Sequence, residues 1–286
     1  MIDLHCHSSA SDGSCTPEEL IFMAKRVGLK ALALTDHDCT SGLPEFEMTA
    51  KQEKFEAIPG IELACRDQNQ QRFHIVGLFI DRHSQQLQEM LAQIITWRNQ
   101  RNAQILERLA EEGKALSLEF VQGYCQGEVL GRPHIAEALV AKGYCQSRKQ
   151  AFEQLIGRGC QAYVPRQVPS PQQCIQGIRD AGGLAVWAHP FSTSNMSNSA
   201  CKNLARMLKE AGLDAIEAYY SMHKPAQTRA ALKIAAELEL LVSGGSDFHG
   251  RQFPALQLGL GKGKLKVPAE ILPPLRQKAL ERQAAG

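Results

Sequence analysis

The first dozen residues of the chain carry side chains suited to binding a metal ion. His5 and His7 follow an apolar start and are separated by one residue. Residues i and i+2 of an extended backbone point to the same face, so the two imidazoles would lie side by side while Cys6 turns away. Asp12 follows in a loop rich in serine. The segment therefore predicts one part of a metal site, and the remaining ligands must come from elsewhere in the chain.

Further histidines and carboxylates follow or occupy the other apolar runs that are expected to be strands. Parallel α/β folds collect ligand-binding groups at the carboxyl ends of their strands. Six of the nine histidines fall on or next to such ends, and Asp247 with His249 repeats the spacing of His5 and His7. A lone histidine such as His74 is as often structural, but the whole set is hard to explain by packing. The expected ligands are His5, His7, Asp12, His37, Glu62, His74, His189, Asp247 and His249.

This set of side chains is larger than one metal ion requires. A single ion with about four to six ligands would use roughly half of the set, whereas two or three ions sharing a bridging carboxylate would use all of it. Clustered ions activate water and clamp phosphoryl oxygens, which is the chemistry of phosphoester hydrolysis. Imidazoles and carboxylates without thiolates favour manganese, iron or zinc over magnesium.

Composition limits the class of protein. A length of 286 residues suits one large α/β domain or two of ordinary size. With a net charge of +2, the protein is not strongly basic over its whole surface, as many nucleic-acid-binding proteins are. A polyanionic substrate must therefore be bound by a local cluster of positive charge or by metal ions. The nine cysteines form no C-x-x-C pair, the start of the chain lacks a signal-like segment, and no apolar run could span a membrane. We expect a cytoplasmic protein with reduced thiols.

Alternating patterns predict an α/β architecture. Helical signals separate most of the strand-like runs, including capping boxes at Thr16 and Ser170 that are each followed by proline. Two further helices are expected at Asn203–Gly212 and Pro225–Leu238 from their apolar periodicity. The seven runs, mostly apolar on both faces as in buried parallel strands, are Met1–His5, Ala31–Thr35, Ala57–Leu63, Phe73–Ile80, Leu184–Ala188, Ala215–Ala218 and Leu240–Ser243.

The alternation is interrupted once, between the fourth and fifth runs. This stretch contains helical patterns at about Ser84–Glu112, Pro133–Lys142 and Ser147–Ile156, and no convincing strand. We therefore predict that residues 87–164 form a helical substrate-binding subdomain, inserted into a domain built from residues 1–86 and 165–286.

The motifs resemble those of the PHP (polymerase and histidinol phosphatase) family. They are His5-x-His7, Asp12-Gly13, Thr35-Asp36-His37-Asp38, Gly60-Ile61-Glu62, Ala188-His189-Pro190 and Ser246-Asp247-Phe248-His249, in the family's order across nearly the whole chain. The resemblance implies a distorted (β/α)7 barrel with a trinuclear divalent metal centre, for which we expect manganese, with iron or zinc possible. No ligand position is missing, so the resemblance implies an active enzyme.

The resemblance also divides the ligands among the ions. His5, His7, Glu62 and Asp247 would hold one ion. Asp12, His37 and His249 would hold a second, and Glu62 would bridge to a third ion shared with His74 and His189. The residues expected to act directly in catalysis are His5, His7, Glu62, Asp247 and His249.

The insertion contains candidates for binding a substrate phosphate. Arg132 and His134 lie at the start of a predicted helix, where free N–H groups and the helix dipole favour anions. Arg98 and Arg101 share one helix face, although a solvated face explains such a pair equally well. His223 follows the sixth run and would contact substrate or donate a proton, with an exposed loop histidine as the alternative.

The insertion and its Gly131-Arg132-Pro133-His134-Ile135-Ala136 motif resemble the RNase AM branch of the family. That branch implies 5′-to-3′ exoribonuclease activity on short RNA and 5′ ends, and phosphatase activity on 3′,5′-nucleoside bisphosphates. In both reactions the phosphoester on the 3′ side of a 5′-phosphorylated nucleotide is hydrolysed. The expected partners are therefore 5′-phosphorylated RNA and these nucleotides, without an obligate protein partner or membrane. Two alternatives stay open: a histidinol-phosphate-like small-molecule phosphatase, and a non-catalytic module that binds nucleic-acid ends.

Overall fold

The computed structural model describes residues 1–125, 130–192 and 196–285. The chain forms two compact units, one of Met1–Met90 with Pro169–Gly286 and one of Leu91–Val168. Each unit has its own group of buried apolar side chains. None of the helices in the described ranges is both long enough and apolar enough to cross a membrane.

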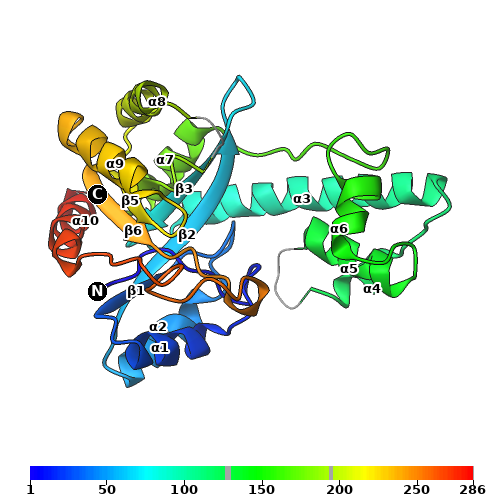
Figure 1. Cartoon of the computed structure of the whole chain (residues 1–286), viewed down its shortest axis with the longest axis horizontal. Helices are drawn as coiled ribbons and strands as arrows, with labels where there is room; N and C mark the ends of the chain where they lie inside the picture. Colours follow the sequence, from blue (N-terminus) through cyan, green and yellow to red (C-terminus); the bar gives the residue numbers. More distant parts are fainter. Residues whose placement is uncertain (126–129, 193–195, 286) are drawn as a thin grey trace. The chain divides into compact units, whose positions relative to one another are not determined.

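A curved sheet forms the centre of the first unit (Figure 1). Within the described residues its six strands are adjacent in the order in which they occur in the chain. The strands are β1 (Ala31–Leu34), β2 (Glu56–Arg66), β3 (Arg72–Leu78), β4 (Leu184–Trp187), β5 (Ala215–Tyr220) and β6 (Leu241–Gly245). The expectation of parallel strands is wrong for β3, which is antiparallel to both β2 and β4. A turn of a few residues joins β2 to β3, and so short a connection permits only a hairpin.

The N-terminal segment lies between the two edges of this sheet. Met1–His5 was expected to be a strand, but it makes only isolated bridges, including Asp3 with Leu32. The Asp3 amide donates to the Ala31 carbonyl at 3.1 Å, and the Leu4 amide donates to the Gly244 carbonyl at 3.0 Å. The segment thus connects β1 to β6 and closes a distorted barrel. Glycine is required at Gly245, because a Cβ there would collide with His5.

Helices cover the outside of the barrel. The Thr16 hydroxyl accepts a hydrogen bond from the Glu19 amide, and the Ser170 hydroxyl caps the next helix after the insertion in the same way. α1 and α2 pack beside β1 and β2, whereas α9 packs on β5 and β6. The helices are α1 (Pro17–Arg26), α2 (Leu43–Gln52), α7 (Pro171–Asp180), α8 (Asn198–Glu210), α9 (Pro225–Glu237) and α10 (Leu272–Ala285).

The second unit is helical throughout its described elements. α3 (Gln85–Glu111) enters it, and α4 (Leu118–Gln122), α5 (Arg132–Ala141), α6 (Arg148–Ala151) and the π-helical turn Phe152–Ile156 follow. Its buried core includes Ile105, Leu109, Val121, Ile135 and Leu139. A separate apolar core of this kind allows the segment to form a body within the chain rather than a long loop.

Candidate metal centre

Nine polar side chains from separate elements meet at one end of the barrel. His5, His7 and Asp12 come from the N-terminal segment, Glu62 from β2 and His74 from β3. The other four follow strands: His37 follows β1, His189 follows β4, and Asp247 and His249 follow β6. All nine expected ligands belong to groups whose donor atoms lie within 4.8 Å of one another.

Glu62 is the centre of this arrangement. Its side chain is almost fully buried, and five of the six histidines contact its carboxylate. The distances are 2.9 Å to His37 and His74, 3.1 Å to His189 and 3.4 Å to His5 and His7. Burial would raise the pKa of Glu62, but His74, His37 and His5 outweigh it and hold the pKa well below its usual value. A permanent negative charge therefore lies inside a ring of imidazoles.

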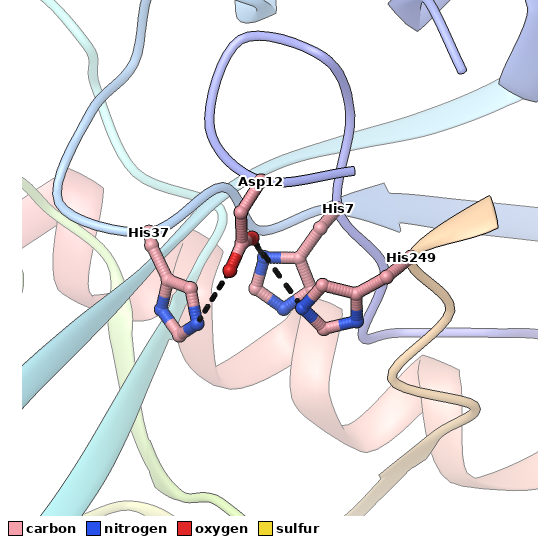
Figure 2. Close-up of side chains that lie close together, drawn as sticks. All are labelled: His7, Asp12, His37 and His249. Atoms are coloured by element: carbon pink, nitrogen blue, oxygen red, sulfur yellow. Dashed lines mark ion pairs between the residues drawn. The ribbon is translucent and has the colours of Figure 1, made fainter. Parts of the chain in front are cut away.

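Asp12 organises a second group with His7, His37 and His249. Figure 2 shows its carboxylate directed between the rings of His37 and His249, with His7 beside them. The Asp12 carboxylate lies 3.4 Å from His249 Nε2 and 3.9 Å from His37 Nε2. These spacings leave room for a cation between the donor atoms.

The remaining groups differ in part from the division that the family resemblance implied. His5, His7 and Asp247 form one group, but Glu62 is grouped with His5 and His189 and again with His37 and His74. His74 Nδ1 and His189 Nε2 both contact Glu62 Oε1. The glutamate is thus shared between neighbouring groups, as a bridging carboxylate would be.

The buried nitrogen atoms of the centre fit a bound cation. Among the described residues, His5 Nε2 and both ring nitrogens of His7 have no hydrogen-bond partner. Buried polar atoms without partners are costly unless a ligand satisfies them. Burial, His249 and His37 lower the pKa of His7 to about 3, so its imidazole is neutral and able to bind a metal. Cys6 points away, and its thiol donates to the Ala33 carbonyl at 3.2 Å.

Backbone strain accompanies the side-chain convergence. His189 and Asp247 have φ angles of 31° and 55°, in a region that non-glycine residues rarely occupy. His189 lies two residues after the end of β4, and Asp247 lies two residues after the end of β6. Such strain persists where the surrounding structure over-determines the backbone, as it does at binding and catalytic sites.

Two residues that support the centre were missed in the sequence. Glu217 in β5 is buried, accepts from His5 Nδ1 at 3.0 Å and from the His189 amide at 2.7 Å. The Tyr220 hydroxyl donates to Asp247 at 3.0 Å. A glutamate inside the apolar run Ala215–Ala218 was a signal that could have revealed Glu217, since a buried carboxylate needs partners.

The loop that carries Asp12 is fixed by another carboxylate. The Ser8 hydroxyl donates to Asp36 at 2.6 Å, and the Ser11 hydroxyl donates to its other oxygen at 2.5 Å. Asp36 is buried, so these hydrogen bonds hold the loop in one conformation. Asp12 is thereby positioned before any ligand binds.

His223 also lies in the barrel unit. Its ring contacts those of Tyr220 and Phe191, and its Nδ1–H donates to the Ala218 carbonyl at 3.1 Å. Burial lowers the pKa of His223 below its ordinary value. Tyr220 lies between His223 and Asp247: its ring contacts the His223 ring, and its hydroxyl donates to the Asp247 carboxylate.

The arginines predicted in the insertion form a basic cluster within the second unit. Arg101 is buried and donates from Nε to the Val164 carbonyl at 2.9 Å. Burial, followed by the charges of Arg132, Arg166 and Arg98, lowers the pKa of Arg101 to about 10. Arg166 was not among the residues expected from the sequence. Such crowding of guanidinium groups is expected where an anion binds.

Arg132 and His134, the other residues expected to bind phosphate, both make contacts within the second unit. The Arg132 guanidinium lies over the rings of Phe152 and Tyr163, and its Nη1 donates to the Ile156 carbonyl at 3.2 Å. His134 Nδ1 accepts from the Gly131 amide at 3.1 Å and so closes the start of α5. Arg132 is thereby held at a helix N-terminus, where an anion is favoured.

The fold and this centre define a class, the barrel hydrolases whose strand ends gather imidazoles and carboxylates for metal ions. The chain belongs to the PHP domain family, whose model matches residues 3–168. It is 36% identical over 271 residues to the 5′-3′ exoribonuclease Rnm of Escherichia coli (strain K12), covering 94% of this chain and 90% of that protein. It is 33% identical over 249 residues to a 3′,5′-nucleoside bisphosphate phosphatase of Chromobacterium violaceum, covering 87% of each chain.

A solved structure supports the same conclusion. A Bifidobacterium adolescentis protein described as a metal-dependent phosphoesterase superimposes with a TM-score of 0.82 and 30% sequence identity, covering 97% of this chain and 96% of that one. The predicted α/β fold, a distorted barrel of the PHP type, is confirmed.

Proposed function

We propose that this protein is a metal-dependent phosphoesterase that acts on 5′-phosphorylated nucleotides. It works as a 5′-to-3′ exoribonuclease on short RNA or 5′ ends and as a phosphatase on 3′,5′-nucleoside bisphosphates. In both cases it hydrolyses the phosphoester on the 3′ side of the 5′-phosphorylated nucleotide. The observation that carries the proposal is the buried Glu62 carboxylate surrounded by five imidazoles, in a chain whose relatives bear the names of both activities.

Three divalent ions are the proposed cofactor, with manganese preferred and iron or zinc possible. Six imidazoles and three carboxylates without a thiolate support this choice. When bound, such ions lower the pKa of water and neutralise charge on a phosphoryl group. As the family resemblance implies, His5, His7, Glu62 and Asp247 would hold the first ion, Asp12, His37 and His249 the second, and Glu62, His74 and His189 the third. In the structure Glu62 groups with His5 and His189 and with His37 and His74, as a glutamate shared between ions would.

The protein groups around the centre keep these donors ready. Glu217 accepts from His5 Nδ1, which directs the lone pair of Nε2 toward Glu62. Tyr220 fixes one oxygen of Asp247 and leaves the other beside His7. His223 is neutral at pH 7 because its pKa is lowered, which favours a role in contacting substrate over that of proton donor.

The basic cluster of the insertion is the proposed site for the 5′-phosphate. Arg98, Arg101, Arg132 and His134 would bind it, together with Arg166. The lowered pKa of Arg101 supports this role, because an incoming phosphate would relieve the repulsion among neighbouring guanidinium groups.

The proposed place of action is the cytoplasm, where thiols stay reduced, and the nine free cysteines support it. The proposal includes no obligate protein partner.

Elemental analysis of freshly purified protein, combined with product assays, tests the proposal. We expect bound transition metal, release of phosphate from adenosine 3′,5′-bisphosphate and release of 5′-mononucleotides from a short 5′-phosphorylated RNA. Faster hydrolysis of histidinol phosphate would favour the small-molecule phosphatase. Binding of 5′-phosphorylated RNA without any product in the presence of manganese would favour the non-catalytic module.

The phosphate-binding assignment has its own test in Arg132→Ala. This variant should lose most of its discrimination between 5′-phosphorylated and 5′-hydroxyl oligonucleotides, because charge-assisted bonds to the phosphate disappear. Its metal content should equal that of the parent. Arg148→Ala is the matched control, since Arg148 lies in the same unit in an exposed ion pair with Glu137. Unchanged discrimination in Arg132→Ala would show that the phosphate binds elsewhere.

A further inference from the structure

We propose that a pocket between α1 and the segment after His249 binds the nucleobase on the 3′ side of the scissile phosphate. This inference rests on the proposed function and extends it to the second nucleotide of an RNA substrate. The pocket lies wholly within the first unit, and its volume is about 700 Å³. Its walls include Phe22, Met23, Phe248, Arg251, Pro254 and Leu256.

One face of α1 forms the first wall. Glu19, Phe22, Met23 and Arg26 recur at helical spacing and all line the pocket. The opposite face of the helix, with Leu20, Ile21 and Ala24, is buried in the core. The helix thus packs on the barrel through this other face, and Phe22 on the pocket side keeps 46% of its surface exposed. An exposed phenylalanine beside a cavity is available to a ligand.

The segment that continues from the metal centre forms the second wall. Phe248, Arg251, Pro254 and Leu256 line this wall, and Phe248 directly precedes His249. The Ser14 amide donates to the His249 carbonyl at 3.0 Å, and the Arg251 amide donates to the Ser14 hydroxyl at 2.7 Å. These contacts hold the pocket wall against the loop that carries Asp12.

The chemistry of the pocket suits a nucleotide. Its aromatic and aliphatic walls can stack on a base without reading the identity of that base. Two guanidinium groups, Arg26 and Arg251, line it, and neither has an ion pair among the residues that the structure describes. The single acidic group, Glu19, already accepts from the Thr16 amide at 2.8 Å. The pocket therefore offers an apolar surface for one base and positive charge for the phosphate that follows it.

The two proposed substrate classes differ at this position. In an RNA, the phosphorus on the 3′ side of the first nucleotide continues into a second ribose and base. In a nucleoside 3′,5′-bisphosphate, nothing follows that phosphorus. An interaction with Phe22 should thus lower the KM for RNA and leave hydrolysis of the bisphosphate unaffected.

Three substrates test the pocket by kinetics: a 5′-phosphorylated dinucleotide, the same molecule with an abasic second residue, and adenosine 3′,5′-bisphosphate. We expect the parent to prefer the complete dinucleotide over the abasic one by about tenfold in KM, the size of one stacking interaction. Phe22→Ala should lose that preference, whereas Phe22→Trp should keep it. Leu280→Ala, which removes an exposed apolar side chain from α10, is the control.

A binding measurement keeps the inference testable without turnover. A non-hydrolysable dinucleotide with 2-aminopurine as its second base should be quenched on binding to the parent, and less so on binding to Phe22→Ala. Equal KM values for complete and abasic dinucleotides in the parent, together with unquenched 2-aminopurine, would overturn the inference. Failure of the proposed function gives a different result, since the metal-loaded parent would then hydrolyse none of the three substrates.

Discussion

The metal centre and the basic cluster of the insertion handle charge in opposite ways. In the centre, negative carboxylates lie among imidazoles, and Glu62 keeps its charge although it is buried. In the insertion, guanidinium groups gather around Arg101 and lower its pKa to about 10. As proposed, cations added to the first region would replace protons, and an anion added to the second would relieve the repulsion among guanidinium groups.

The proposed function assigns these two regions different parts of a polyanionic substrate, in a chain whose net charge is only +2. The proposed metal ions would bring positive charge to the centre, where the chain itself supplies carboxylates. The insertion supplies permanent positive charge from a cluster of guanidinium groups, in which Arg101 and Arg132 are fixed by bonds to main-chain carbonyls. Perturbing one region should therefore leave the ion preference of the other intact.

The largest effect should follow from Glu62→Gln. The amide keeps the shape of the side chain but removes the charge that five imidazoles contact. We expect a loss of more than about a hundredfold in activity on every substrate, because even supporting residues of metal sites cost about 10–100-fold. Metal content and rates should be measured beside Glu210→Gln, an exposed control. If Glu62→Gln binds as much metal as the parent, Glu62 is not a ligand of the metal centre.

Glu217→Gln should have an intermediate effect. The variant keeps an acceptor for His5 Nδ1 but loses the charge that makes this imidazole a stronger ligand. We expect metal affinity to fall by about 10–100-fold while KM at saturating metal stays near that of the parent. Titration with manganese measures the first quantity and steady-state kinetics the second. A raised KM with unchanged metal affinity would mean that Glu217 contacts substrate instead.

Metal binding should release protons and strengthen with pH. Burial lowers the pKa of His37, but Glu62, Asp12 and Asp38 outweigh it and raise the pKa to about 9. His37 is thus protonated at pH 7 without metal, and it must lose that proton to become a ligand. Affinity should rise between pH 7 and pH 9 by up to about tenfold per pH unit for this one proton.

Calorimetry in two buffers of different ionisation enthalpy counts the released protons. His37→Ala should release fewer than the parent. An affinity that does not change over this pH range, with equal proton release in both proteins, would contradict the ligand role of His37.

The smallest expected effect concerns stabilisation by anions. Sulfate or phosphate should raise the midpoint of thermal unfolding of the parent by a few degrees, because a ligand at a hundred times its Kd contributes about 2.7 kcal/mol. Arg132→Ala should lose most of this shift and keep the shift caused by manganese. Chloride at equal ionic strength is the control. An equal response to sulfate in parent and variant would place the anion site outside the cluster.

Much of the fold was predictable because local chemistry determines it. The capping boxes at Thr16 and Ser170 begin α1 and α7 as expected, since their hydrogen bonds involve residues only three positions apart. The helix α2 was missed, because Gly42 provides no side-chain cap to mark its start. The pattern of β3 did not reveal its direction, since an apolar run has the same composition in parallel and antiparallel sheets.

The sequence by itself determined which residues have the chemistry for the centre, because imidazoles and carboxylates recur on or next to the apolar runs and the pair His5 and His7 has the same spacing as Asp247 and His249. Only the tertiary structure decided which of them share an ion-sized space, with Glu62 contacting five histidines and His7 joining the Asp12 group. Sheet register and side-chain rotamers set those distances, and both depend on residues far apart in the chain. The same reason explains why Glu217, Arg166 and the pocket beside Phe22 emerged only when distant segments came together.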